Sequence, residues 1–244
     1  MFRFSLVVLG AALLAGCGGG GGSSKPSAAA SITNTYNFVT PALNSQRTYA
    51  KTIVDNSNNT INESVVDTIS TVNVDGSFTI HTEDPNHNSI TVNGTVYSVP
   101  TETTTVNNSG HETSYSVLSN APVTCTFTPE GPGPNYPFAV GDTWSSSWNL
   151  ACGNNTPINF TQTGSVVDTE SVTVPAGTFA TFKLQSTISW TDAKGTTHTD
   201  SRTTWKDINS SHTTIKELDS YSYSGTVPIN GRAVTTTRIL QSQS

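Results

Sequence analysis

Turn-forming residues divide this chain at intervals of about a dozen residues, and the stretches between them are rich in β-branched residues. The dipeptide Asn93-Gly94 lies between 90–92 and 95–97, two short stretches made of Ile, Thr, Val and Tyr. Asn-Gly in this position is the strongest local signal of a two-residue β-hairpin. Thr makes up about one residue in six, whereas helix formers such as Leu, Lys and Glu are sparse. The chain is therefore predicted to be all-β.

The stretch 182–190 shows the period of a strand that buries one face. Its apolar residues share that face and are Phe182, Leu184, Ile188 and Trp190. The residues expected in water lie between them and include Lys183, Gln185 and Ser189. No stretch of the chain sustains the period of a helix. We therefore expect an antiparallel meander of about a dozen strands that forms a sandwich or a half-barrel.

One sequence window recurs about one hundred residues further along the chain. Aligned without a gap, 64–78 and 165–179 share eight of fifteen positions, and both begin with SVVDT. The shared Gly suits a turn that needs positive φ, and the Phe two residues later is expected to anchor the next strand. The aromatic segments 36–38 and 136–138 show a similar spacing upstream. Two related β units are therefore expected, the alternative being independent strands drawn from the same biased composition.

A dense run of Pro and Gly at 129–135 marks the expected boundary between these units, because it disfavours both helix and sheet. The first β unit is expected at 32–128 and the second at 136–244, each of about 100 residues. The sequence leaves open whether the units are separate domains or share one sheet.

The first residues follow the pattern of an export signal. A positively charged start precedes an apolar stretch at 6–14 that is too short to span a bilayer. The stretch runs into Leu14-Ala15-Gly16-Cys17, which resembles the lipobox of bacterial lipoproteins. The resemblance implies that 1–16 is a cleaved signal peptide and that Cys17 carries lipid such as palmitate. The alternative is an ordinary signal peptide followed by an incidental cysteine.

The segment 17–31 is rich in Gly, Ser and Ala and is expected to be a flexible tether. Gly18 is not the Asp that lipoprotein sorting associates with retention at the inner membrane. The resemblance therefore implies an anchor in the outer membrane, facing either the periplasm or the cell surface.

The second unit carries a further set of motif residues, and these are 136–144, Gly164, Glu170, 172–179, Trp205 and 215–217. Together they resemble a signature of uncharacterised exported bacterial proteins, P-L-x-V-G-x-x-W … E-x-V-x-V-P-A-G-T-F … W-Y … G-x-V-K. This chain departs from the signature at Lys206 and lacks the Gly before the final motif. The resemblance implies a β-rich fold and brings no activity with it.

Cys125 and Cys152 remain once Cys17 is set aside. A pair of cysteines in an oxidising envelope compartment favours a disulfide over a metal or redox site. Such a bond would add roughly 3–4 kcal/mol to stability in the chain-entropy account. Two separately buried thiols are the alternative.

Neither catalytic residues nor a cofactor site can be assigned from the sequence. No Gly-x-Ser-x-Gly elbow is present, and no Gly-rich loop precedes a helix. The best polar cluster lies at an expected hairpin end and supplies weak candidates for metal ligands, which are His81, Glu83, Asp84 and His87. A solvated loop explains the same residues, because hairpin ends are polar in most proteins.

Four tryptophans are candidates for a ligand platform, and these are Trp144, Trp148, Trp190 and Trp205. The first two are four residues apart, so a regular strand would place them on one face. If such rings line an open concavity, a hydrophobic or carbohydrate ligand is expected. The alternative is that all four rings pack in the core.

The formal net charge of −6 and the lack of a basic run argue against a nucleic-acid partner. The lipoprotein resemblance implies that the protein contacts the membrane through the lipid on Cys17. Three functions remain open for such an envelope protein. The leading hypothesis is a non-catalytic module that binds or supports another envelope component. The second is a carrier of a lipid or other hydrophobic ligand, and the third is a metal-dependent hydrolase.

Overall fold

The structure is a computed structural model that describes residues 35–55, 58–85, 89–92, 95–98, 101–118, 122–210, 213–224 and 233–244. Twelve strands form a closed antiparallel barrel, and two more form a separate hairpin. The barrel strands are β1 (Gln46–Asp55), β2 (Thr60–Val72), β3 (Phe78–Glu83), β6 (Thr101–Val106), β7 (Glu112–Leu118), β8 (Val123–Thr128), β9 (Thr143–Cys152), β10 (Ile158–Val174), β11 (Gly177–Thr191), β12 (Thr197–Asp207), β13 (Thr214–Ser224) and β14 (Ala233–Gln243). The prediction of an all-β antiparallel fold is confirmed, and the sheet closes completely.

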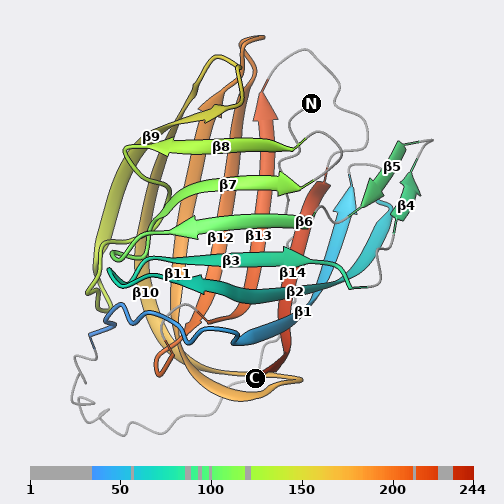
Figure 1. The fold of residues 1–244 in the computed structure, drawn as a ribbon. Helices are drawn as coiled ribbons and strands as arrows, with labels where there is room; N and C mark the ends of the chain where they lie inside the picture. Colours follow the sequence, from blue (N-terminus) through green and yellow to red (C-terminus); the bar gives the residue numbers. More distant parts are fainter. Residues whose placement is uncertain are drawn as a thin grey trace, which may run out of the picture.

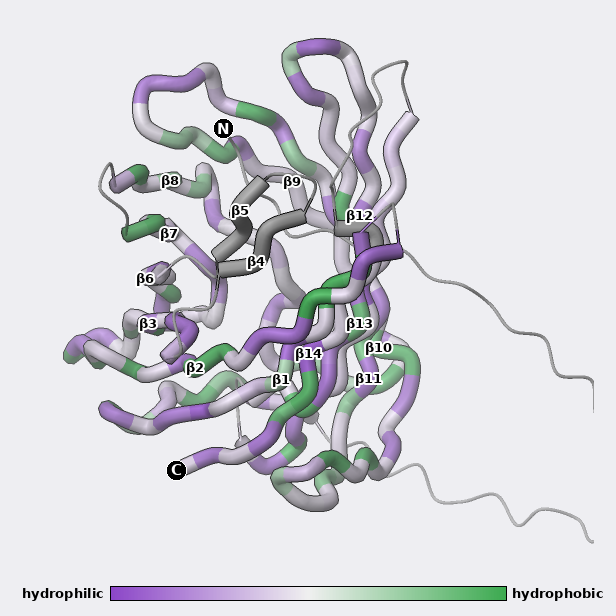
Figure 2. The backbone as a smooth tube through the Cα atoms, turned by 90° about the vertical axis from the view of Figure 1, so that its right-hand side faces the viewer, coloured by the Kyte–Doolittle hydropathy of each residue, from purple (hydrophilic) through white to green (hydrophobic). Residues whose placement is uncertain are grey.

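The barrel is flattened into two walls that face each other (Figure 1). Strands β2, β3, β6, β7 and β8 form the first wall and run crosswise to the second wall, which consists of β9 to β13. The walls join where β8 pairs with β9 and where β1 pairs with both β2 and β14. Hydrophobic and hydrophilic positions are interspersed along these strands in Figure 2, as expected where one face of a strand looks inward.

The strand predicted at 182–190 lies in β11, and its four apolar residues are buried as expected. The hairpin predicted around residues 93 and 94 is represented by its two strands, β4 (Ser89–Val92) and β5 (Thr95–Ser98), which pair with each other. The turn residues themselves lie outside the described residues. So do the predicted signal peptide, the tether with Cys17, and His87.

Both copies of the repeated window fold as a strand, a turn and a second strand. The first forms β2 and β3, and the second forms β10 and β11. Gly76 and Gly177 both have positive φ, at 87° and 135°, which explains why glycine occupies both turns. The anchors differ, because Phe78 is fully buried while Phe179 is only partly buried.

The difference arises because the β10–β11 hairpin is longer than the barrel wall to which it belongs. Its tip curls beneath the lower end of the barrel in Figure 1. Val174, with Val172 and Phe179 partly buried beside it, packs there against Tyr49 and Leu240. The hairpin that carries the VPAGTF sequence therefore closes this end of the barrel.

The two halves of the chain form one sheet across the Pro- and Gly-rich segment at 129–135. Strand β8 precedes the segment and pairs directly with β9, which follows it. Cys125 and Cys152 are partners in this pairing and form a disulfide. The upstream aromatic segments also meet, because Tyr36 and Phe138 exchange two backbone hydrogen bonds, of 2.6 and 3.0 Å. The expected units thus share one barrel.

Candidate functional site: an acidic and aromatic cavity

A cavity of about 330 Å³ lies inside the barrel between the two walls. One side is aromatic and is formed by Tyr115, Phe127, Trp148, Phe160 and Trp190. The other side is charged and is formed by Glu102, Glu112, Asp200 and Arg202. The volume lies at the lower end of the range for small-molecule sites, and an apolar lining with a few polar groups is typical of them.

Strand register assembles the aromatic side. Phe160 on β10 is paired with Trp148 on β9 and with Trp190 on β11, so their side chains share the inner face. The rings of Trp148 and Phe160 stack at 5.7 Å between centroids, and those of Phe160 and Trp190 lie 5.1 Å apart. Trp190 in turn stacks on His198 at 4.9 Å. The rings are therefore held in place before any ligand binds.

The charged side contains one basic residue, Arg202, which is already engaged. Its Nε lies 2.8 Å from Oδ1 of Asp219, and its Nη2 donates to Oδ2 of Asp200 at 3.2 Å. The side chain of Asp200 is only 6% exposed, and its second oxygen, Oδ1, is buried without a hydrogen-bond partner. Burial raises the pKa of Asp200 above its ordinary value, although Arg202 opposes the shift.

Glu102 and Glu112 project from the first wall toward this group. Within the described part of the chain, neither carboxylate has a hydrogen-bond or ion-pair partner. Burial raises the pKa of Glu102, with Lys51 lowering it less. Burial also raises the pKa of Glu112, against the opposing charge of Arg202. The cavity thus holds carboxylates whose negative charge nothing nearby fully offsets.

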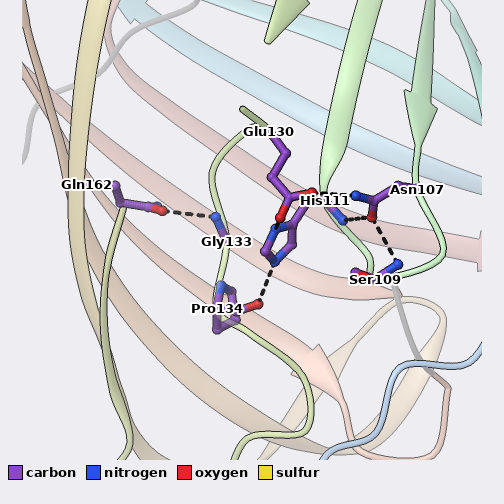
Figure 3. A network of polar contacts seen from close by, with 7 residues as sticks. All are labelled: Asn107, Ser109, His111, Glu130, Gly133, Pro134 and Gln162. Atoms are coloured by element: carbon purple, nitrogen blue, oxygen red, sulfur yellow. Dashed lines mark hydrogen bonds and ion pairs between the residues drawn. The ribbon is translucent and has the colours of Figure 1, made fainter. Parts of the chain in front are cut away.

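The segment 129–135 forms part of the cavity wall, to which it contributes Pro132. Figure 3 shows how His111 holds it in place. Nδ1 of His111 lies 3.0 Å from Oε1 of Glu130, and Nε2 lies 3.1 Å from the carbonyl oxygen of Pro134. The contact of Nε2 with Pro134 has hydrogen-bond geometry, whereas the contact of Nδ1 with Glu130 is within ion-pair distance but lacks that geometry. Asn107 completes the anchor by donating to Oε2 of Glu130 at 2.6 Å.

A second anchor fixes the same segment to β10. The backbone N–H of Gly133 donates to Oε1 of Gln162 at 2.9 Å (Figure 3), and Nε1 of Trp144 donates to the same oxygen at 3.1 Å. Gly131 packs so closely that an added Cβ would lie 3.0 Å from the backbone oxygen of Glu112. The segment expected to be a linker is therefore bound to the barrel from both walls.

The four tryptophans predicted as a ligand platform do not all lie at the cavity. Trp148 and Trp190 line the cavity. Trp144 shares the inner face with Trp148, as its spacing predicted, but it lies beside Gly164 and packs against a different cluster. Trp205 points to the outer face, because strand alternation places it opposite the cavity-lining residues Asp200 and Arg202.

The outer-face position of Trp205 brings several residues of the VPAGTF resemblance together. Lys183 and Lys216 lie over its ring at 5.3 and 5.0 Å, and its Nε1 donates to Oε1 of Glu170. Lys183 is also 3.2 Å from Glu170. These contacts link four strands of the second wall and are separate from the cavity.

The weak metal candidates lie apart from the cavity. His81 and Glu83 are 3.5 Å apart on the outer face of β3, since Thr82 between them points inward to Asp67. Asp84 is instead buried, with 2% exposure. Among the described residues, no three His, Cys, Asp or Glu side chains are grouped to hold a metal ion.

A second group of buried charges lies near β1, β2 and β14, and we call it the paired region. Lys51 is 3.7 Å from Glu63, and Arg238 forms an ion pair with Asp67. Arg238 also lies 3.8 Å from the centre of the Tyr49 ring. Each carboxylate of these two pairs therefore has its own cation.

No protein-family model and no curated protein matches this chain. Among solved structures it is similar to a "putative exported protein with YmcC-like fold" from Bacteroides fragilis, with 12% identity, a TM-score of 0.49, and coverage of 87% of this chain and 100% of that one.

Two further solved structures are similar at a comparable level. A "putative lipoprotein" from Parabacteroides distasonis has 12% identity and a TM-score of 0.44, covering 86% of this chain and 99% of that one. The "hypothetical lipoprotein YmcC" from Escherichia coli has 10% identity and a TM-score of 0.45, covering 82% and 88%. Likeness at this level assigns no ligand or activity to this chain. In the described residues no helix is long and apolar enough to cross a membrane.

Proposed function

We propose that this chain is a lipid-anchored protein of the bacterial cell envelope whose barrel binds a small molecule in its interior cavity. The cavity carries the proposal, because it combines a volume of about 330 Å³ between the two walls, a pre-arranged aromatic side and a few polar groups. This favours the carrier hypothesis over a purely structural module. The aromatic side suits an apolar portion of the ligand, and no catalytic step is assigned to the site.

The anchor is supported by the leader and by the small residues before Cys17. In this proposal Cys17 carries acyl chains, 17–31 acts as a tether, and the barrel stands off the outer membrane. Acyl chains bind membranes by burying methylene groups, each worth about 0.8 kcal/mol.

The ligand site can be tested by filling the cavity. Thr104 lines it, so Thr104→Phe is expected to occupy the space of a ligand. Thr103 precedes it on β6 and faces outward, which makes Thr103→Phe a matched control. Protein purified from its own host would be extracted with organic solvent and the extract analysed by mass spectrometry. A small molecule should accompany the wild type and the control but not Thr104→Phe. A wild-type protein that carries nothing and binds nothing would contradict the proposal.

The anchor can be tested independently by growing cells with labelled palmitate. The wild-type chain should take up the label and fractionate with the outer membrane, whereas Cys17→Ala should do neither. Label that persists in Cys17→Ala would show that lipid is attached elsewhere or that the membrane association has another cause.

A further inference from the structure

We propose that the molecule bound in the cavity is an organic cation, an amine or quaternary ammonium compound with an apolar portion. This rests on the proposed function, since it specifies the chemistry of a ligand at the same site. The apolar portion would lie against Trp148, Phe160 and Trp190, and the cationic group would lie between the carboxylates of the two walls.

The charges that line the cavity are unequal in sign. Three carboxylates, those of Glu102, Glu112 and Asp200, face one guanidinium, that of Arg202. The guanidinium is already committed to Asp219 at 2.8 Å and to Asp200 at 3.2 Å. An anionic ligand would therefore approach carboxylates without finding a free cation, while a cationic ligand would reduce the excess of negative charge.

The arrangement of unpaired atoms supports the same conclusion. The side chain of Asp200 is only 6% exposed, and its Oδ1 atom is buried without a hydrogen-bond donor. Glu102 and Glu112 have no ion-pair partner among the described residues. A buried acceptor without a donor, such as Asp200 Oδ1, is costly in a folded protein, and ammonium groups supply donors as well as charge. A neutral apolar ligand would fill the space but leave this acceptor unpaired and the charge of the carboxylates unbalanced.

Three probes of similar size and different charge separate the alternatives. Benzylammonium is a cation, benzyl alcohol is neutral and benzoate is an anion, and all carry the same ring. Binding of each to the purified full chain would be measured by titration calorimetry at pH 7 and low salt. We expect benzylammonium to bind at least about tenfold more tightly than benzyl alcohol, and benzoate to bind most weakly.

The matched variants are the double change Glu102→Gln and Glu112→Gln, and the outer-face change Glu83→Gln. The double variant should lose the preference for benzylammonium while binding benzyl alcohol as before, which also shows that it is folded. Glu83→Gln should behave like the wild type, since Glu83 is 40% exposed on the other side of β3.

Three results would overturn the inference. If benzyl alcohol or benzoate binds as tightly as benzylammonium, the cavity remains a ligand site but its ligand is not a cation. If the preference for benzylammonium survives in the double variant, Glu102 and Glu112 do not recognise the cation and the inference fails. If none of the probes binds and Thr104→Phe changes nothing, the proposed function fails and this inference fails with it.

Discussion

Charged side chains inside the barrel lie in two different environments, the paired region and the cavity. In the paired region, Glu63 and Asp67 each lie beside a basic side chain, and the β10–β11 hairpin covers the neighbouring apolar cluster. In the cavity, Glu102 and Glu112 lie in a space large enough for a small molecule and have no ion-pair partner among the described residues.

The two regions differ in whether the chain itself supplies a cation to each carboxylate. A carboxylate enclosed by packed protein is stable in its ionised form when a cation is enclosed with it. The paired region supplies a cation to each carboxylate from within the chain, although burial still raises the pKa of Glu63 against the opposing charge of Lys51. The cavity does not, so its charge balance is left to protonation, water or a ligand.

The largest effect is expected from removing the disulfide, which links β8 to β9 beside the cavity. Changing both Cys125 and Cys152 to Ser should lower the free energy of unfolding by roughly 3–4 kcal/mol, because it frees a loop with a sequence separation of 27. Urea denaturation measures the loss. Hydrogen exchange should show that β8 and β9 lose protection while β1 and β14 keep theirs. Equal loss in both regions would mean that they are not structurally distinct.

In the paired region, Asp67→Ala should lower the free energy of unfolding by about 3 kcal/mol. The change leaves Arg238 without its partner and removes the acceptor of Thr82, whose Oγ1 donates to Asp67 at 2.8 Å. Thermal and urea denaturation measure the effect. Glu83→Ala on the outer face is the control and should change stability by no more than about 0.5 kcal/mol. A loss below about 1 kcal/mol for Asp67→Ala would contradict the pairing.

Stability should also depend on pH because of the charged side of the cavity. Burial raises the pKa of Glu102 and Glu112, and it raises that of Asp219 to about 8 despite Arg202. A carboxylate with a raised folded-state pKa favours folding when protonated, and this contribution is lost as pH rises through that pKa. The melting temperature should therefore fall from pH 5 to pH 8. The fall should be smaller in the double variant Glu102→Gln and Glu112→Gln, and a melting temperature that rises over this range would refute the assignment.

The smallest effect is expected from Glu112→Gln alone. Because this carboxylate lacks a partner, its replacement by a neutral amide should leave stability unchanged or raise it by up to about 1 kcal/mol at pH 7. Asp67→Ala is expected to lower the free energy of unfolding, whereas Glu112→Gln is expected to leave it unchanged or raise it. This difference in sign tests the comparison of the two regions most directly. Destabilisation by more than about 2 kcal/mol would show that Glu112 has an internal partner after all.

Local patterns were sufficient for much of the secondary structure. The period of two in 182–190 identified β11 and its buried face, since alternation along a strand is a local property. The repeated window correctly indicated two strand–turn–strand elements, with Gly76 and Gly177 in the positive φ that their turns require. The disulfide agrees with the prediction from compartment and cysteine number.

The sequence predicts the candidate site only in part. It indicates Trp148 and Trp190 as ligand-platform candidates, but nothing in their neighbourhoods distinguishes them from Trp205, which faces outward. The sequence does not single out Glu102 and Glu112, because a charged residue in a strand is expected to face water. Alternation with Thr103 fits the inward position of Glu102, but a register shift between β6 and β7 brings Glu112 to the same face as Tyr115, which alternation does not predict.

Strand content, hairpin positions and the burial face of β11 thus follow from residues close together in the chain, because backbone propensity and alternation act over a few residues. The pairing of β1 with β14, the folding of 129–135 into the wall and the placement of Glu112 and Arg202 in one cavity lining bring together residues far apart in the chain. Such contacts depend on how the sheet twists and closes, and only the closed barrel brings the carboxylates and the aromatic rings to one cavity.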